Sequence, residues 1–589
     1  MATGSRAISW GTTGRHRGAT GRSAFRSKAP RHCRPSDGRR IISSIKSLQF
    51  QPGRTDMMEN RIRAPWLQAV LGLGLAACAV GTAALAQEPQ RGGTLNVLNI
   101  SDINSLNPAV ASGVQTMMPG AQMFAGLVEL ENTWDPKPYL AEKWEVSADG
   151  LAYTFHLVKD AVFHDGKPIT SEDVAFSIEA VKATHPFGAT MFGNVAKVET
   201  PDAGTVVVRL SKPTASLLLS LSPHFTPILP KHVFGTEPLR THPRNNSPVG
   251  SGPFKFVEYK PGEYVALERF DKFFRKGRPY LDKIVISTLR DKSAQAVALS
   301  RGDIQLAPFA PLAISDIVRL RKESKLTVTD KGSEGIGWIN WLDFDLRKPP
   351  FNDVRVRQAV SYAIDRKFIR EKLQQGVSKP ATGPIASSNP FFAKDLNPYD
   401  LNLDKANKLL DDAGFKRKPD GTRFTARLDW IPIFPDYYQT VAEYLRPQLK
   451  KVGIDVQLRP APDFSTWAQR VSNWDFDMNI GSSYNYGDPV IGVHRTYVSS
   501  NIRKGVPYSN VAGYSNPKVD DLLARASGET DTAKRKALYH EFQKIVNEEV
   551  PVAILFEVPV VTIHDKRLQN VPLGIWGGMA PFDKVYFRK

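Results

Sequence analysis

One stretch, residues 140–182, restricts the fold of this chain more than any other part of the sequence. Tyr153, Phe155 and Leu157 alternate with polar residues, which is the two-residue period of a half-buried strand. Asp-Gly pairs, typical of tight turns, stand before this strand and after a second short strand. Thr170, with Asp173 three residues later, then has the pattern of a helix-capping box. The stretch therefore predicts two strands, two turns and a capped helix in immediate succession.

The same stretch contains four side chains of the kinds found in metal and acid–base sites: His156, Asp160, His164 and Asp165. No further ligand follows at the spacing of a metal site. We therefore interpret all four as surface or hydrogen-bonded structural residues. Neither a metal ion nor a cofactor is predicted for this chain.

Length and charge limit the classes of function. At 589 residues the chain exceeds one ordinary hydrophobic core and is expected to divide into at least two lobes. The formal net charge is +19, but the first 86 residues alone contain 14 Lys and Arg against 3 Asp and Glu. The remaining excess of positive charge is spread thinly, without a run of like charges or an aromatic-interleaved basic patch. We therefore predict no nucleic-acid partner.

The beginning of the chain predicts export. Residues 1–56 are rich in Arg, Ser and Gly and lack an apolar period, so they are expected to be disordered or to precede the true start at Met57 or Met58. Residues 57–86 have a basic start, an apolar middle and a final Ala-Leu-Ala, which is the pattern of a secretory signal peptide. We expect cleavage after Ala86 and a periplasmic location.

Two alternatives remain for this leader. The sequence LAAC that ends at Cys78 fits a lipidation motif, although the residues after it stay apolar. The apolar run would also serve as an uncleaved anchor, at the short limit for spanning a bilayer. Cys33 and Cys78 are the two cysteines of the chain, so the part after residue 86 has no disulfide, thiolate site or cysteine nucleophile.

After the leader, strand and helix patterns alternate, which indicates an α/β protein. Residues 251–269 read as a hairpin around a Pro-Gly turn, and residues 338–346 as a strand that runs into PPFND, where Asp353 caps the next helix. Further expected elements are helices over residues 117–130 and 532–549, a strand over residues 454–458, and a strand that runs into a polar loop over residues 475–489.

Taken together, these segments resemble the family 5 extracytoplasmic solute-binding proteins, which are the dipeptide, oligopeptide, nickel and glutathione receptors of ABC importers. The resemblance is carried above all by residues 140–182, by the G-P-F hairpin and by the strand that precedes PPFND. It implies a two-lobed α/β periplasmic binding protein fold of type II, cluster C, with an extra subdomain in the first lobe. It also implies closure of the lobes about a hinge near residues 338–344 and 552–561.

The resemblance also implies how the chain is divided. After the upstream segment, residues 1–56, and the signal peptide, residues 57–86, the expected parts are a first lobe over residues 87–342 with an inserted subdomain at about residues 135–249, a second lobe over residues 343–555, and a return to the first lobe over residues 556–589.

The resemblance further places ligand contacts in the segment that ends in Gly-Asp-Pro489. In peptide-binding relatives this segment pairs with the ligand backbone and offers an aspartate to its α-ammonium. Here the aligned residue is Asn485, which keeps an acceptor but lacks the charge. Asp488 is the other candidate for this role, with capping of a helix that starts at Pro489 as the alternative. Tyr484 and Tyr486 are expected to stack on the solute or, alternatively, to pack in the core.

Four more residues complete the expected ligand site. Trp430 is a candidate wall at the end of a strand, with core packing as the alternative. Asn104, Ser105 and Ser251 stand in loops that resemble the ligand-facing loops of the family.

No catalytic motif accompanies this pattern. The chain has neither a G-x-x-x-x-G-K-[ST] loop nor a G-x-S-x-G elbow, and His540-Glu541 lacks the second histidine of a zinc site because residue 544 is lysine. We therefore predict no enzyme but a monomeric periplasmic receptor that captures a peptide or peptide-like small solute and delivers it to the permease subunits of an ABC importer. The alternatives are a secreted peptidase-like hydrolase and a chaperone or adhesin that uses the receptor fold. Composition leaves the identity of the solute open.

Overall fold

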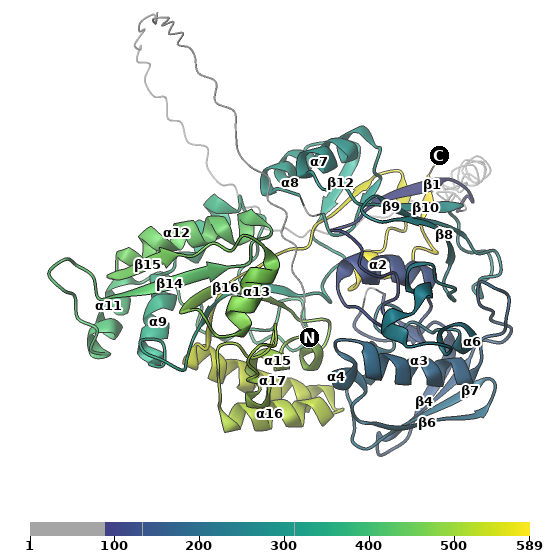
Figure 1. The fold of residues 1–589 in the computed structure, drawn as a ribbon, viewed down its shortest axis with the longest axis horizontal. Helices are drawn as coiled ribbons and strands as arrows, with labels where there is room; N and C mark the ends of the chain where they lie inside the picture. Colours follow the sequence, from purple (N-terminus) through teal and green to yellow (C-terminus); the bar gives the residue numbers. More distant parts are fainter. Residues whose placement is uncertain (1–88, 132, 311, 589) are drawn as a thin grey trace, which may run out of the picture. The chain divides into compact units, whose positions relative to one another are not determined.

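The computed structural model describes residues 89–131, 133–310 and 312–588 of the protein (Figure 1). All of them belong to one compact unit, Gln87–Lys589. The upstream segment, the signal peptide and both cysteines lie outside the described residues. Within the described part, the strands form three large sheets and two small pairs, β2 (Val128–Glu129) with β3 (Lys137–Pro138) and β19 (Leu568–Gln569) with β20 (Tyr586–Phe587).

The largest sheet has seven strands among the described residues and contains both an early and a late part of the chain. Its order is β12 (Leu326–Thr329), β18 (Thr562–Asp565), β11 (Leu306–Ala307), β1 (Thr94–Leu98), β10 (Lys283–Ser287), β9 (Tyr264–Arg269), β8 (Phe254–Lys260). Strand β1 is parallel to β10 and β11, and Leu95 and Val97 face Ile284 and Ile286 with all four side chains fully buried. The expected hairpin is confirmed as β8 and β9, joined through Gly262 at a φ of 77°.

A four-stranded sheet, in the order β4 (Ala141–Val146), β5 (Ala152–Leu157), β7 (Thr205–Leu210), β6 (Val195–Asp202), contains the stretch that most restricts the fold. Tyr153, Phe155 and Leu157 are buried as the alternation predicted. Helix α3 (Ser171–Thr184) follows, and Asp173 accepts a hydrogen bond from the Thr170 main chain at 2.9 Å. This is one half of the predicted capping box, and it fixes where the helix begins.

The helix expected over residues 117–130 is wrong in its second half. Helix α2 (Val114–Met123) ends earlier, and residues 128–129 pair as β2 with β3. Gly126 lies so close to the carbonyl oxygen of Leu221 that a Cβ atom would stand 2.6 Å from it, so this position accepts only glycine without a shift of its neighbours. The remaining helices between β1 and β12 are α4 (Gly188–Phe192), α5 (Leu217–Ser220), α6 (Lys231–Phe234), α7 (Lys292–Arg301) and α8 (Ile314–Leu320).

The third sheet has five strands in the described residues, in the order β15 (Ile454–Leu458), β14 (Phe424–Trp430), β16 (Met478–Tyr484), β13 (Trp338–Phe344), β17 (Val552–Glu557). Strand β13 is buried along its whole length and pairs antiparallel with β16 on one side and β17 on the other. Figure 1 shows helices on both sides of this sheet. They are α9 (Val354–Ala363), α10 (Arg366–Phe368), α11 (Leu403–Asp412), α12 (Gln439–Lys450), α13 (Phe464–Ser472), α14 (Pro489–Gly492), α15 (His494–Tyr497), α16 (Pro517–Gly528) and α17 (Thr532–Glu549).

We call the part with the seven- and four-stranded sheets the first lobe and the part with the five-stranded sheet the second lobe. Two connecting segments join them, residues 330–337 between β12 and β13 and residues 558–561 between β17 and β18. The boundaries expected after residues 342 and 555 fall inside β13 and β17. Because both strands belong to the five-stranded sheet of the second lobe, we propose that the lobe boundaries and the hinge lie in the connecting segments instead.

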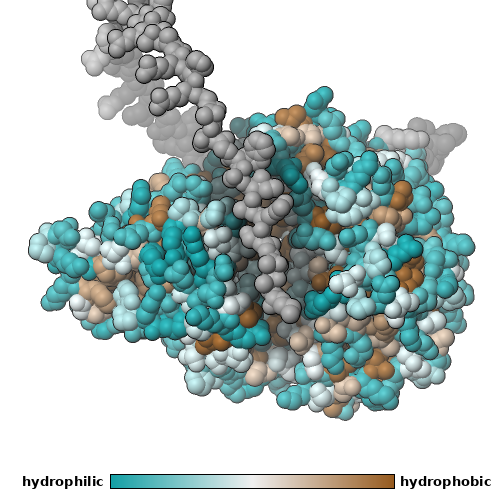
Figure 2. Space-filling view, in the orientation of Figure 1, coloured by the Kyte–Doolittle hydropathy of each residue, from teal (hydrophilic) through white to brown (hydrophobic). Residues whose placement is uncertain are grey.

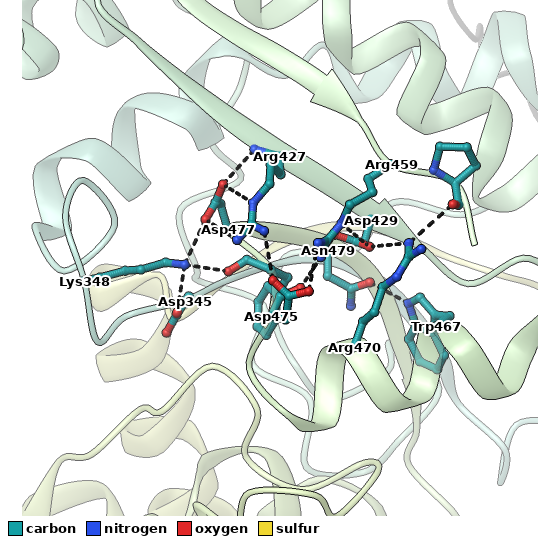
Figure 3. Close-up of polar contacts among 12 residues, drawn as sticks. Asp345, Lys348, Arg427, Asp429, Arg459, Trp467, Arg470, Asp475, Asp477 and Asn479 are labelled. Atoms are coloured by element: carbon teal, nitrogen blue, oxygen red, sulfur yellow. Dashed lines mark hydrogen bonds and ion pairs between the residues drawn. The ribbon is translucent and has the colours of Figure 1, made fainter. Parts of the chain in front are cut away.

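A network of ion pairs, in which acidic and basic side chains alternate, connects strands of the second lobe (Figure 3). Arg427 donates to Asp477 at 3.0 Å and to Asp475 at 2.8 Å, while Lys348 reaches the other oxygen of Asp477 at 2.9 Å. Arg459 continues the chain from Asp475 to Asp429. Acids and bases therefore compensate each other, which favours a structural role for the network.

Hydrophilic residues cover most of the face that Figure 2 shows, with hydrophobic residues scattered in small groups. The large hydrophobic side chains that are exposed are distant in sequence: Val146, Val257, Val297, Phe368, Leu401, Ile433, Phe464 and Tyr508. Phe464 and Tyr508 are the pair among them whose rings are neighbours, with centroids 6.4 Å apart. Exposed apolar side chains that stand singly are common on protein surfaces.

Candidate functional site

The end of strand β16 carries the aromatic part of the expected ligand site. Tyr484 lies opposite Trp338 of β13, and the two rings meet edge to face with centroids 5.4 Å apart. Tyr486 meets Tyr484 in the same way at 5.6 Å. Burial raises the pKa of both tyrosines above the ordinary value, so both hydroxyls are neutral at physiological pH.

Asn485 is buried and its side chain is saturated by main-chain groups of one loop. Its Oδ1 accepts from the Ala386 main chain at 2.7 Å, and its Nδ2 donates to the Pro384 carbonyl at 3.1 Å. Its own main-chain N–H donates to Ile336 in a connecting segment at 2.7 Å. The amide thus holds two loops together, and this geometry leaves a solute little of it to contact.

Asp488 caps a helix, as the alternative interpretation of the sequence predicted. The carboxylate accepts from Val490 at 2.9 Å at the start of α14, where Pro489 is the first helical residue. It also forms a buried ion pair with Arg535 of α17 at 2.7 Å. Burial acts to raise the pKa of Asp488, but the charge and hydrogen bonds of Arg535 outweigh it and hold the pKa below the usual range.

The loop after β16 also touches the first lobe. The Tyr486 ring lies 5.0 Å from Phe187 and 6.3 Å from Phe225, centroid to centroid. At the next residue, Gly487, a Cβ atom would stand 2.7 Å from Leu219 and 2.9 Å from Trp576, both in the first lobe. The segment that the sequence singled out therefore lies where the two lobes meet.

The other four expected residues are placed differently. Trp430 ends β14 and is only 6% exposed, in agreement with core packing. Asn104 is exposed, while Ser105 is buried and accepts from Asn107 at 3.1 Å. Ser251 is fully buried, accepting from Ala125 and donating to Ile228, so it stabilises the interior of the first lobe.

The structure shows a pocket that the sequence did not reveal. It encloses about 420 Å³ of space, part of it open to solvent, on the face of β13 and β16 beneath α13 and α15. Asp343 and Trp341 of β13 and Asn479 and Gly481 of β16 lie at neighbouring register positions and form part of the lining. The other lining residues are Trp467, Val471, Ser482, Ser483, Arg495, Thr496, Tyr508, Ser509 and Val511. All belong to the second lobe, and the only hint in the sequence was an aspartate inside a strand of apolar residues.

The pocket lies beside the contact between the lobes. Its lining residue Arg495 holds its guanidinium 5.6 Å from the ring of Phe187 in the first lobe and 5.6 Å from the ring of Tyr508. A second cavity, of about 350 Å³, lies within the second lobe between Arg366, Tyr399 and Asn547 and contains none of the expected ligand residues.

Comparisons with known proteins decide the family. Residues 135–504, more than half of the chain, match the family described as bacterial extracellular solute-binding proteins, family 5. The chain belongs to family 5 of the solute-binding proteins. This solute-binding protein is 31% identical to heme-binding protein A of Haemophilus influenzae over 75% of its own length and 83% of that relative. It is also 30% identical to a putative ABC transporter peptide-binding protein of Brucella ovis, over 79% of this chain and 87% of the relative.

Solved structures agree with this assignment. The oligopeptide-binding protein AppA of Bacillus subtilis, solved with a nonapeptide, superimposes with a TM-score of 0.72 and 26% identity, covering 85% of this solute-binding protein and all of AppA. The expected two-lobed type II fold is thereby confirmed. Proteins of this family are extracellular transport receptors rather than enzymes, so the hydrolase alternative is not favoured.

Three structural observations accompany the family assignment of this solute-binding protein. Among residues 89–131, 133–310 and 312–588, no three His, Cys, Asp or Glu side chains are grouped so that they would hold a metal ion. In the same residues, His164 bonds to Gly250 and Gly252 at 3.1 and 3.0 Å, which is the structural role expected for it. None of the helices described is long and apolar enough to cross a membrane.

Proposed function

We propose that this protein binds a peptide or peptide-like solute where its lobes meet and presents the closed, loaded form to the permease of an ABC importer. The observation that carries the proposal is the second-lobe pocket, whose rim residue Arg495 contacts Phe187 of the first lobe. A solute in that pocket touches one lobe and lies next to the other. It therefore favours the state in which both lobes contact it, which is the requirement for closure by a ligand.

The named relatives support the class of solute. The Brucella relative is named as peptide-binding, AppA was solved with a nonapeptide, and a relative of Escherichia coli is named dipeptide-binding protein. Tyr484 and Tyr486 do not line the second-lobe pocket, but they lie beside it at the contact between the lobes, and we retain these two expected residues as ligand contacts there. The polar side-chain atoms of Asn485 and Asp488 form hydrogen bonds with other protein groups. We therefore propose that these two residues hold the loop that carries the two tyrosines in place.

We further propose that residues 57–86 are a signal peptide removed after Ala86, that Cys78 is not lipidated, and that the exported protein is a monomer without affinity for nucleic acid. Sequencing the N-terminus of the exported protein tests cleavage. A mature chain that begins upstream of Met57, or one that begins with a lipid-modified Cys78, contradicts the proposal.

Ligand-induced thermal stabilisation tests the main proposal. A ligand at 100 times its Kd adds about 2.7 kcal/mol to the free energy of unfolding, which is easily measured. The panel comprises di- to nonapeptides, free amino acids, opines, nickel–histidine and haemin, the last because one relative is named heme-binding protein A. Calorimetry of the compounds that raise the melting temperature follows. Stabilisation by peptides is expected, whereas stabilisation by haemin alone would replace the peptide proposal.

A further inference from the structure

The floor of the second-lobe pocket contains an acid that lacks a charged partner. Asp343 is 3% exposed, its Oδ2 accepts a hydrogen bond from Asn479 at 2.8 Å, and the Trp341 side chain is a second, neutral donor beside it. No basic side chain of the described residues contributes to its electrostatic environment. Burial therefore raises the pKa of Asp343 to about 7, with the hydrogen bonds acting in the opposite direction. A buried carboxyl group with so little compensation is costly unless something else binds it.

The neighbouring acid on the same face of the sheet shows how this protein compensates a structural carboxylate. Asp429 flanks Asn479 from strand β14, as Asp343 does from β13. Arg459 donates to both oxygens of Asp429 at 3.0 Å, and Arg470 approaches it at 3.5 Å (Figure 3). Asp429 thus has two cations, while Asp343, one strand away, has none among the described residues. Asp343 is therefore not simply another member of the ion-pair network.

Gly481 lets the Asp343 carboxylate lie directly against strand β16. A Cβ atom at this position would stand 2.6 Å from Asp343 Oδ2 and 3.3 Å from Trp341 Nε1. The Trp341 N–H is buried beside this carboxylate and acts on it as a donor, outside good hydrogen-bond geometry. The Asp343 carboxylate thus has only neutral donors around it, from Asn479 and Trp341, although it is buried at the lining of a pocket.

The walls and the rim of the pocket suit a solute that has both a positively charged group and a negatively charged group. The Trp467 and Tyr508 rings, 6.3 Å apart, offer aromatic faces, which attract cations. At the rim, Arg495 interacts with tyrosines, and no acid of the described residues contributes to its environment. The pocket therefore presents a carboxyl group on its floor and a guanidinium at its rim, which matches a solute with a cationic group and a carboxylate.

We propose that Asp343 is the specificity-determining residue for a positively charged group of the solute, an ammonium or guanidinium such as that of a lysine or arginine side chain in a peptide. This inference rests on the proposed function and adds the chemistry of the preferred solute. A cationic donor compensates the buried carboxylate and forms a charge-assisted hydrogen bond. A neutral isostere leaves the carboxyl group uncompensated, and an anion is repelled by it.

Calorimetry with matched peptides on the protein purified from the periplasm tests the inference. The probes are tripeptides of alanine that carry lysine, arginine, norleucine or citrulline at each of the three positions in turn. Citrulline keeps the length of the arginine side chain, norleucine keeps the four-carbon chain of lysine without its nitrogen, and both remove the charge. The proteins compared are wild type, Asp343→Asn, Gly481→Ala and the control Asp429→Asn, which removes a carboxylate from the same sheet face outside the pocket.

For wild type we expect the cationic peptide to bind at least tenfold more tightly than its neutral isostere at one position. Asp343→Asn and Gly481→Ala should abolish this preference while alanine tripeptides still bind, and Asp429→Asn should keep it. Filling of the pocket should also change the tryptophan fluorescence, and Trp341→Phe should reduce that change. Equal binding of charged and neutral peptides by wild type, or a preference that survives Asp343→Asn, overturns the inference and leaves the proposed function intact. Absence of binding by every peptide overturns both.

Discussion

The carboxylate of Asp488 and the guanidinium of Arg535 form a two-pronged ion pair, at 2.7 and 2.8 Å, that joins the start of α14 to α17. The two side chains are only 7% and 6% exposed. Substitution Arg535→Met should therefore leave a buried carboxylate without its partner and lower the free energy of unfolding by about 3–5 kcal/mol. Denaturation by urea, followed by circular dichroism, measures this loss.

A matched control separates this effect from the loss of any arginine. Arg525 pairs with Asp521 at 3.2 Å, and both side chains are 60% exposed. The free energy of unfolding should fall by less than about 1 kcal/mol in Arg525→Met. Equal losses in the free energy of unfolding of Arg535→Met and Arg525→Met would show that the buried ion pair stabilises the protein no more than the exposed one.

The amide of Asn485 should not be replaceable by a carboxylate. In wild type, Asn485 Nδ2 donates to the Pro384 carbonyl oxygen at 3.1 Å. In Asn485→Asp a carboxylate oxygen takes the place of Nδ2 and faces that carbonyl oxygen without a hydrogen to share. We expect a loss of about 1–3 kcal/mol in the free energy of unfolding and no gain in affinity for peptides with a free α-amine. Urea denaturation and calorimetry measure the two quantities. Asn352→Asp, at an exposed position, is the control and should be almost neutral. A stable Asn485→Asp variant with tighter peptide binding would restore Asn485 as a ligand contact.

Asp477 should make the second lobe sensitive to acid. Partial burial acts to raise the pKa of this carboxyl, but the hydrogen bonds from Arg427 and Lys348 outweigh it and hold the pKa well below its usual range. The stabilisation is present above the unfolded-state pKa of about 3.9 and is lost as the pH falls toward the folded-state value. At pH 7 the Asp477→Asn variant should therefore have a lower free energy of unfolding than wild type. Below pH 4 this difference in the free energy of unfolding should become smaller. Melting temperatures between pH 3 and 7 test this, and a constant difference would contradict it.

Asp343 should act in the opposite direction. Burial raises its folded-state pKa to about 7, above the unfolded-state value of about 3.9. The folded state then holds an extra proton between these values, so stability falls as the pH rises from about 4 to about 7. The quantity to compare is the free energy of unfolding of Asp343→Asn minus that of wild type, both without ligand. This difference should be about 2–4 kcal/mol larger, in favour of the variant, at pH 8 than at pH 4. Asp521→Asn, at an exposed position, should show no such trend in urea denaturation at the two pH values.

Closure should be visible in solution. Because the connecting segments are short and separate two packed sheets, a bound solute is expected to move the lobes as rigid bodies. Small-angle X-ray scattering should show a smaller radius of gyration at saturating concentrations of a solute identified by calorimetry. An unchanged radius of gyration with such a solute would exclude closure.

Much of the fold could be predicted because its signals are local. Strand β15 and helix α17 have the predicted bounds, since a glycine or a capping aspartate marks where each begins and each keeps its apolar period. Helix α2 was predicted too long because the apolar residues continue past Met123, while Val128 and Glu129 pair with residues 137–138 as a strand, a contact that the apolar period does not encode. The pocket could not be predicted in this way. Asp343 and Asn479 are 136 residues apart and meet through the antiparallel register of β13 and β16, which local patterns do not encode.

The two connecting segments leave neighbouring strands of one sheet and enter neighbouring strands of the other. Strands β12 and β18 pair with each other on one side, and β13 and β17 pair on the other. Residues 338–557 are therefore a continuous insertion whose two ends stand next to each other. Protein engineers can treat the second lobe as an exchangeable cassette: one cut at each connecting segment transfers its pocket to a related receptor, while every strand of the host sheet keeps its partner.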